Sequence, residues 1–287
     1  MSGNEIAVTT PLELPDRDGR VDFSTEVVLV GGMGYLGTRF STDLLLQQGK
    51  AATSVDLNIY DPKTPGHSVE SFDPRSFEDR TVIWLASFHR ERPGEENNPA
   101  VVDAYQELLV TQPLRAASYA KRFIYVSSMR SFEGGLYGTM KRKAEHALLP
   151  FKNAASVRFG TVWGGLSRQL PNRTRTAINH ALLHQSFEGD TWRAHHTYIS
   201  QASDILIRMA DMKLLGGSVV NTCFPEKLSA RELRELLKGS HRDERLQALF
   251  SKEMDFLNER NARETILAQA QDLKVESRLR SHYNLPS

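Results

Sequence analysis

The sequence predicts an α/β protein in which a doubly wound parallel sheet is covered by helices on both faces. From Val27 onward, short apolar runs alternate with helical patterns, as in sheets built from strand and helix units. One run, Thr81 to Ala86, is apolar throughout, which is typical of a strand buried on both faces. The first run, Val27 to Val30, leads directly into closely spaced glycines and a further helical pattern.

Composition and charge limit the classes of function. The chain has 287 residues, 40% of them hydrophobic, enough for one large domain or two modest ones. A net charge of +1 with acids and bases interspersed predicts neither a nucleic-acid partner nor a membrane surface. Cys223 is the single cysteine, no apolar run is long enough to span a bilayer, and no signal-peptide core is present. We therefore expect a cytoplasmic protein without disulfides.

The glycines after the first predicted strand are the strongest local signal. Gly31 is placed to make a tight turn, Gly34 to let backbone N–H groups approach a pyrophosphate, and Gly37 to let the following helix lie close to the strand. By itself the pattern is equally compatible with an ordinary glycine-rich turn. Its position between a strand and a helix favours a dinucleotide site of the Rossmann type.

The next elements indicate which dinucleotide is bound. A helix is predicted from Tyr35 to about Gln48, followed by a strand that ends at Asp56, nineteen residues after Gly37. A carboxylate at this position accepts hydrogen bonds from the adenine ribose and repels a 2′-phosphate, so NAD is favoured over NADP. Arg39 could pair with such a phosphate, but a solvated helix residue is the preferred interpretation.

The remaining pattern suggests how the chain is divided. Residues 1–24 are polar and aperiodic and predict a mobile tail. Residues 25–164 form the predicted NAD-binding domain, with 197–222 contributing to the sheet region. Residues 165–196 and 223–287 form a small substrate lobe and a C-terminal helical segment, which is expected to pack on the body or on a second subunit. Within the domain, a helix over about 100–120 should kink or break at Pro113.

Polar side chains gather after the predicted strand Arg122 to Ser128. Ser127 and Ser128 end this strand at the carboxyl edge of the sheet, where open α/β sheets bind ligands. Tyr137 follows nine residues later and opens a helix, and Lys141 lies one turn further on the same face. An exposed helix start with a solvated lysine is the alternative interpretation of this pair.

These motifs together resemble the extended short-chain dehydrogenase/reductase superfamily, in its nucleotide-sugar epimerase/dehydratase branch. The resemblance extends from about Val27 to about Lys238. The segments that match the family's motifs are Gly31 to Gly37, Trp84 to Ser87, Tyr125 to Ser128, Tyr137 to Glu145, and Val157 to Gly164.

The resemblance implies roles for individual residues. Tyr137, Lys141 and Ser128 would be catalytic, and the cofactor contacts would come from Gly31, Gly34, Tyr35, Leu36, Gly37, Asp56, Leu85, Ala86 and Lys141. A free tyrosine, with a pKa of about 10, is too weak a base. Lys141 and the positive nicotinamide ring would therefore have to stabilise its phenolate. Lys141 would also hold the nicotinamide ribose, and Ser128, less readily Ser127, would bind the substrate oxygen.

Departures from the family pattern limit the substrate assignment. The 4,6-dehydratases of the family have an Asp-Glu pair where this chain has Met129 and Arg130, so dehydration is disfavoured. Thr161 replaces an asparagine associated with the substrate diphosphate. The residues that could contact substrate are Ser127, Thr161, Arg168, Arg173, Arg175 and Arg193, although solvated loop arginines are an equal alternative. No metal site is predicted.

Three functions remain open from the sequence. The leading hypothesis is an NAD-dependent epimerase or ketoreductase that acts on a nucleotide-linked sugar, within a homodimer. The second is a reductase or dehydrogenase of a small non-nucleotide ketone or aldehyde. The third is a non-catalytic NAD-binding scaffold or sensor.

Overall fold

The computed structural model describes residues 26–32, 34–55, 73–88, 94–163, 193–211, 216–223, 226–229 and 231–233. The predicted N-terminal tail and most of the predicted substrate lobe and C-terminal segment lie outside these residues. So do Asp56, Arg168, Arg173 and Arg175.

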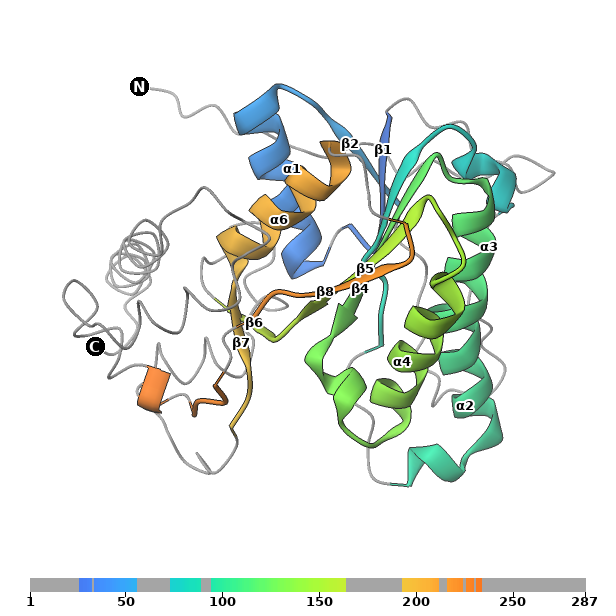
Figure 1. Cartoon of the computed structure of the whole chain (residues 1–287), viewed down its shortest axis with the longest axis vertical. Helices are drawn as coiled ribbons and strands as arrows, with labels where there is room; N and C mark the ends of the chain where they lie inside the picture. Colours follow the sequence, from blue (N-terminus) through green and yellow to red (C-terminus); the bar gives the residue numbers. More distant parts are fainter. Residues whose placement is uncertain are drawn as a thin grey trace, which may run out of the picture.

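The centre of the molecule is a six-stranded sheet in which all neighbouring strands are parallel, in the order β2-β1-β3-β4-β5-β8 (Figure 1). This arrangement confirms the predicted α/β class. The strands are β1 (Val27–Val30), β2 (Ala52–Val55), β3 (Thr81–Trp84), β4 (Arg122–Ser128), β5 (Ala154–Phe159) and β8 (Ser218–Asn221).

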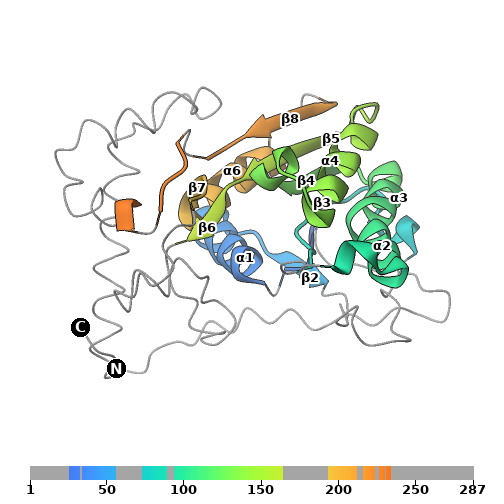
Figure 2. The same cartoon turned by 90° about the horizontal axis from the view of Figure 1, so that it is seen from below.

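Helices cover both faces of the sheet (Figure 2). One layer contains α1 (Tyr35–Gln48) and α6 (Ile199–Asp211), and the other contains α2 (Pro99–Gln106), α3 (Gln112–Tyr119) and α4 (Leu136–Leu148). Side chains alternate between the two layers because successive residues of a strand point to opposite faces. In β1, Val28 and Val30 join the core under α2, α3 and α4, whereas Leu29 joins the core under α1 and α6.

The helix that is expected to kink or break at Pro113 stays helical from residue 99 to residue 119, but its α-helical pattern is interrupted just before this proline. Between α2 and α3 the chain makes a π-helical turn, η3 (Glu107–Thr111), and Pro113 stands at the start of α3. Proline has no N–H to donate to the carbonyl four residues earlier, which belongs to Leu109. The Tyr125 hydroxyl from β4 donates to that carbonyl oxygen at 2.8 Å.

Smaller elements complete the described part of the chain. A second sheet pairs β6 (Thr161–Trp163) with β7 (His196–Tyr198), and the 3₁₀ helices are η1 (Pro74–Phe77), η2 (Glu95–Asn97) and η4 (Met129–Phe132). Ser229 and Glu232 form a reciprocal helix cap: the Ser229 N–H donates to the Glu232 carboxylate at 2.9 Å, and the Glu232 N–H donates to the Ser229 hydroxyl oxygen at 3.2 Å.

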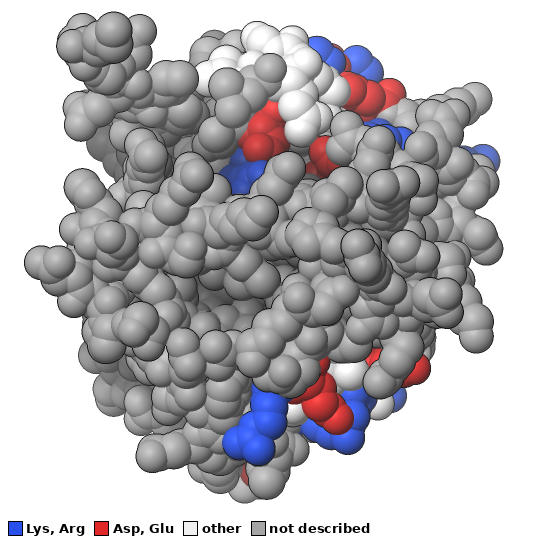
Figure 3. Space-filling view, turned by 90° about the vertical axis from the view of Figure 1, so that its left-hand side faces the viewer, with Lys and Arg blue, Asp and Glu red and all other residues white. Residues whose placement is uncertain are grey.

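The described charged residues on one face of the molecule carry both signs. On the face drawn in Figure 3, the described acidic and basic side chains lie beside one another. Among the helices of the described residues, none combines the length and apolar character that crossing a bilayer requires.

Candidate active site

The glycine turn after β1 is shaped by contacts that only glycine permits. Gly31 has a φ of 86°, and its N–H donates to the Val55 carbonyl oxygen at 2.7 Å. A Cβ atom on Gly31 would lie 2.6 Å from the Ala86 nitrogen, and one on Gly37 would lie 2.3 Å from the Gly32 carbonyl oxygen. The turn therefore lies directly against the end of β3, and α1 lies directly against the turn.

This turn lies at the point where the strand order reverses. β1 has β2 on one side and β3 on the other, so the chain crosses back over β1 between them. Ligands of open α/β sheets bind at such a point, beyond the carboxyl ends of the strands. The N–H groups of Leu85 and Ala86 both donate to the Val30 carbonyl oxygen at 2.8 Å, which fixes the two strand ends against each other.

The helix α1 begins at an exposed glycine beside the turn. Gly34 caps the helix with an exposed backbone, and an added Cβ would have the Gly31 carbonyl oxygen at 3.3 Å as its nearest contact. Tyr35 and Leu36 follow as half-buried residues of the first helical turn. Arg39 is bound to Asp43 at 2.8 Å, which agrees with its interpretation as a helix surface residue.

Tyr137, in the first turn of α4, lies where the ends of β3 and β4 meet. Burial raises the pKa of its phenol, while hydrogen bonds with the side chains of Ser87 and Ser128 and the charge of Arg130 act to lower it. The structure thus brings Tyr137 and Ser128 together. Ser87 was missed by sequence reasoning, although it follows β3 at the same edge of the sheet at which Ser128 ends β4.

Lys141 is buried beside Tyr137, with a side chain almost closed to solvent. Its Nζ donates to the Val126 carbonyl oxygen at 2.8 Å and lies 4.6 Å from the ring centroid of Tyr125 and 5.6 Å from that of Tyr137. Burial lowers the pKa of Lys141 to about 7, and the nearby charge of Glu145 opposes this shift.

Glu145 lies one further turn along α4 in a buried ion pair. Both of its oxygens accept from Arg158 of β5, at 2.9 and 2.6 Å, and the Ser127 hydroxyl donates to one of them at 2.5 Å. Ser127 is therefore directed toward Glu145 and is only 4% exposed. The structure places Ser127 in this internal network and Ser128 beside Tyr137.

Two of the remaining predicted substrate residues lie in the described part of the chain. Thr161 begins β6, and its N–H donates to the His195 carbonyl oxygen at 2.7 Å. The Arg193 guanidinium is engaged by Glu232 at 3.0 Å and by the Lys227 carbonyl oxygen at 3.2 Å.

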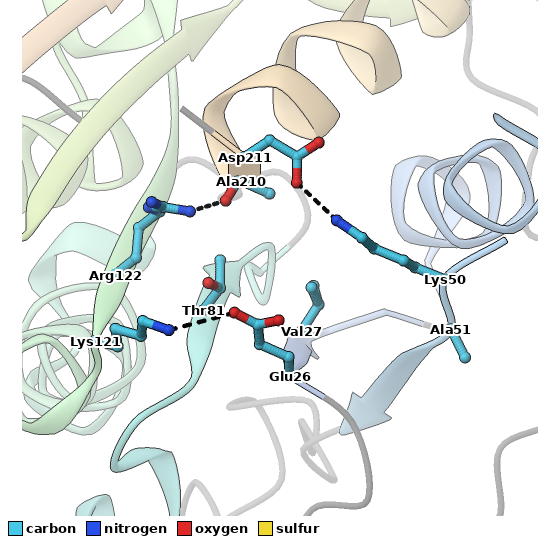
Figure 4. A pocket seen from close by; sticks show the side chains of 9 residues that line it. All are labelled: Glu26, Val27, Lys50, Ala51, Thr81, Lys121, Arg122, Ala210 and Asp211. Carbon is cyan, nitrogen blue, oxygen red and sulfur yellow. Dashed lines mark hydrogen bonds and ion pairs between the residues drawn. The ribbon is translucent and has the colours of Figure 1, made fainter. Parts of the chain in front are cut away.

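A cavity of about 460 Å³ lies at the opposite, amino edge of the sheet (Figure 4). Its charged side chains pair with groups in its own wall: Lys50 with Asp211 at 3.1 Å, and Lys121 with Glu26 at 3.5 Å. Arg122 donates to the Ala210 carbonyl oxygen. These mutual contacts hold the base of the sheet, and we assign no catalytic chemistry to the cavity. It is lined by Glu26, Val27, Lys50, Ala51, Thr81, Lys121, Arg122, Ala210 and Asp211.

No protein-family model matches the chain, and no curated protein matches it by sequence. Solved structures do resemble it. MoeE5 in complex with UDP-glucose and NAD is 18% identical, with a TM-score of 0.54 over 74% of this chain and 80% of that one. The UDP-N-acetylglucosamine 4-epimerase from Bacillus cereus is 14% identical, with a TM-score of 0.53 over 88% of this chain and 100% of that one.

The Bordetella bronchiseptica enzyme WbmF, in complex with NAD+ and UDP, is 15% identical, with a TM-score of 0.52 over 91% of this chain and 96% of that one. These likenesses agree with the strand order and the two helical layers described above. The chain therefore has the Rossmann-type α/β fold of these three proteins.

Proposed function

We propose that the protein is an NAD-dependent enzyme of the extended short-chain dehydrogenase/reductase type. It acts on a nucleotide-linked sugar by hydride transfer at a carbinol or ketone carbon, as an epimerase or a ketoreductase. The observation that carries this proposal is the convergence of Ser128, Tyr137 and Lys141 on the sheet edge that also bears the Gly31 turn. Two proteins of the same fold hold NAD, with UDP-glucose in MoeE5 and with UDP in WbmF.

The glycine turn fits a dinucleotide. Gly34 is exposed at the N-terminus of α1, where backbone N–H groups and the helix dipole favour phosphate. Gly31, Gly34 and Gly37 would hold the pyrophosphate, with Tyr35, Leu36, Leu85 and Ala86 around it, and Asp56 would bind the adenine ribose. Bound NAD supplies the hydride acceptor, and its reduced form the donor.

Tyr137 is the group that moves the proton. In oxidation its phenolate takes the proton of the substrate hydroxyl as the carbon loses hydride, and in reduction the phenol returns it. Ser128 holds the substrate oxygen at the phenol, and Ser87 adds a second hydroxyl there. Lys141 supplies an ammonium beside Tyr137 and would bind the nicotinamide ribose.

Cofactor binding is the first test. Purified protein is denatured to release bound small molecules for mass spectrometry, and the stripped protein is titrated with NAD and NADP. We expect NAD to bind more tightly than NADP. Asp56→Ala should remove this preference, whereas Asp103→Ala, at an exposed position of α2, should retain it. Failure of wild-type protein to bind either dinucleotide contradicts the proposal.

Catalysis is the second test. Tyr137→Phe should abolish hydride transfer while NAD still binds, and Tyr119→Phe, at an exposed position of α3, should leave the rate unchanged. Retained NAD that recycles within the site favours epimerisation, and reversible cofactor exchange favours reduction. An unchanged rate in Tyr137→Phe would point instead to the non-catalytic NAD-binding protein.

A second candidate is a reductase of a small ketone or aldehyde without a nucleotide. The observation that favours it concerns Arg193, one of the residues predicted to contact the substrate. Its guanidinium is bound by Glu232 and by the Lys227 carbonyl oxygen. Turnover of carrier-free carbonyl compounds, with no turnover of nucleotide-linked ones, would select this candidate.

A further inference from the structure

Arg130 lies directly beside Ser128 and Tyr137 of the proposed catalytic site. It lies in η4, immediately after β4, and its N–H donates to the Ser128 hydroxyl oxygen at 3.2 Å. The first turn of α4 closes on it from the other side, because a Cβ on Gly138 would lie 2.2 Å from the Arg130 carbonyl oxygen. The backbone of Arg130 is thus fixed between Ser128 and the helix that positions Tyr137.

The side chains around Arg130 leave an excess of positive charge. Glu133 is the carboxylate shared by two cations, Lys227 at 3.0 Å and the Arg130 Nε at 3.5 Å. Burial alone would raise the pKa of Glu133, yet Lys227 and Arg130 hold it below its ordinary value. One carboxylate cannot neutralise two cations, so among the described residues a net positive charge remains around Arg130.

Among the residues that the structure describes, none binds the two terminal nitrogens of Arg130, which leaves them open to a ligand. Within the described part of the chain, the guanidinium meets a carboxylate through Nε alone, and the side chain is 48% exposed. A guanidinium offers two parallel N–H donors that match the two oxygens of a carboxylate. The charge of Arg130 also acts on the Tyr137 phenol, which places the guanidinium within electrostatic range of the reacting hydroxyl.

We infer that Arg130 recognises a carboxylate on the substrate, close to the carbon whose hydroxyl Tyr137 would deprotonate. The substrate class is then a sugar acid or a comparable hydroxy or keto acid rather than a neutral sugar. This inference rests on the proposed function, because it takes Tyr137 and Ser128 as the groups that bind the reacting oxygen. Arg130 is a specificity-determining residue that touches the substrate and takes no part in the proton transfer.

The test compares two ligands that differ in one group. Full-length, NAD-loaded protein is titrated by calorimetry with UDP-glucuronic acid and with UDP-glucose, and UDP alone reports the contribution of the diphosphate. Wild-type protein should bind the carboxylate ligand about 10- to 100-fold more tightly than the neutral one. This ratio corresponds to the free energy that a hydrogen-bonded pair of opposite charges contributes.

Variants then assign this preference to Arg130. Arg130→Gln should remove it while UDP binding is retained, and Arg130→Lys should keep part of it, since the charge remains but the paired donors are lost. Arg142→Gln is the matched control, because Arg142 is an exposed arginine of α4 that donates to the Glu133 carbonyl oxygen. NAD retention shows that each variant is folded.

The outcomes separate this inference from the proposed function. Equal affinity for the two ligands, no binding of the carboxylate ligand, or a preference that survives in Arg130→Gln overturns the role of Arg130. In each of these cases, Tyr137-dependent hydride transfer on any other substrate would keep the proposed function. Loss of NAD binding by wild-type protein would instead remove the proposed function.

Discussion

At the scale of single residues, Lys141 shows a conflict between stability and the proposed activity. Its ammonium is buried and is bound to the Val126 carbonyl oxygen, and the two nearby rings lie within cation–π range. Burial lowers its pKa from 10.5 to about 7. Holding the proton there weakens the fold, while the proposed chemistry requires a cation beside Tyr137.

Because the pKa of Lys141 is lower in the folded chain than in the unfolded chain, the free energy of unfolding depends on pH. Below pH 7 both the folded and the unfolded chain hold the proton, so the full burial cost is present. Between pH 7 and 10.5 the folded chain has released the proton and the unfolded chain keeps it, so the contribution of Lys141 to stability rises with pH.

Lys141→Met should therefore raise the free energy of unfolding by about 1–2 kcal/mol at pH 6 and abolish hydride transfer. The gain should shrink as the pH approaches 10. Denaturant unfolding at several pH values measures it, with Lys143→Met, at an exposed position of the same helix, as the control. A destabilised Lys141→Met protein at pH 6 would show that the ammonium is favourably solvated in its site.

At the scale of elements, the π-helical turn between α2 and α3 is joined to the sheet by one hydrogen bond. Pro113 removes the helical donor for the Leu109 carbonyl, and the Tyr125 hydroxyl replaces it at 2.8 Å. The same Tyr125 ring lies 4.6 Å from the Lys141 ammonium. The irregular turn is thereby connected to the proposed active site through one side chain.

Tyr125→Phe should lower the free energy of unfolding by about 1–3 kcal/mol, because a buried carbonyl loses its donor. Pro113→Ala restores an N–H to the helix, so the double variant should lose less than Tyr125→Phe alone. Denaturant unfolding of the two single variants and the double variant gives the coupling energy. Additive effects would mean that the two groups do not share the Leu109 carbonyl.

At the scale of the whole molecule, β7 joins the small sheet to α6, which packs on the main sheet. His196 of β7 is fully buried, and its Nε2 lies 2.7 Å from the Leu228 carbonyl oxygen. Burial lowers the pKa of His196 to about 4, with the Leu228 carbonyl opposing this shift and His195 adding to it. The folded protein therefore holds this histidine neutral near pH 7.

Acidic pH should lower the free energy of unfolding through protonation of His196. Stability from neutral His196 is fully present above pH 6.5 and is lost as the pH falls toward 4, because the unfolded chain takes up the proton first. The loss is about 3 kcal/mol from this group. His196→Gln should flatten the fall in unfolding free energy across that range, whereas His146→Gln, at an exposed position of α4, should leave it unchanged. Parallel slopes in wild-type protein and His196→Gln would contradict the assignment.

The sequence by itself determined the features that depend on near neighbours in the chain. The alternation of apolar runs and helical patterns predicts the parallel sheet. The tight turn at Gly31 and the interruption of the α-helical pattern before Pro113 follow from the conformational properties of glycine and proline. The predicted ends of the Tyr35 helix and of the Arg122 strand agree with α1 and β4 for the same reason.

The tertiary structure alone decided which distant groups meet. Ser127 and Ser128 are neighbouring candidates in the sequence, but adjacent strand residues point to opposite faces of a sheet. In the folded protein the Ser127 side chain therefore contacts Glu145, whereas the Ser128 side chain contacts Tyr137. Ser87 joined Tyr137 because β3 and β4 are neighbours in the sheet. Strand order and side-chain direction are set by packing across the whole core, which local sequence patterns do not contain.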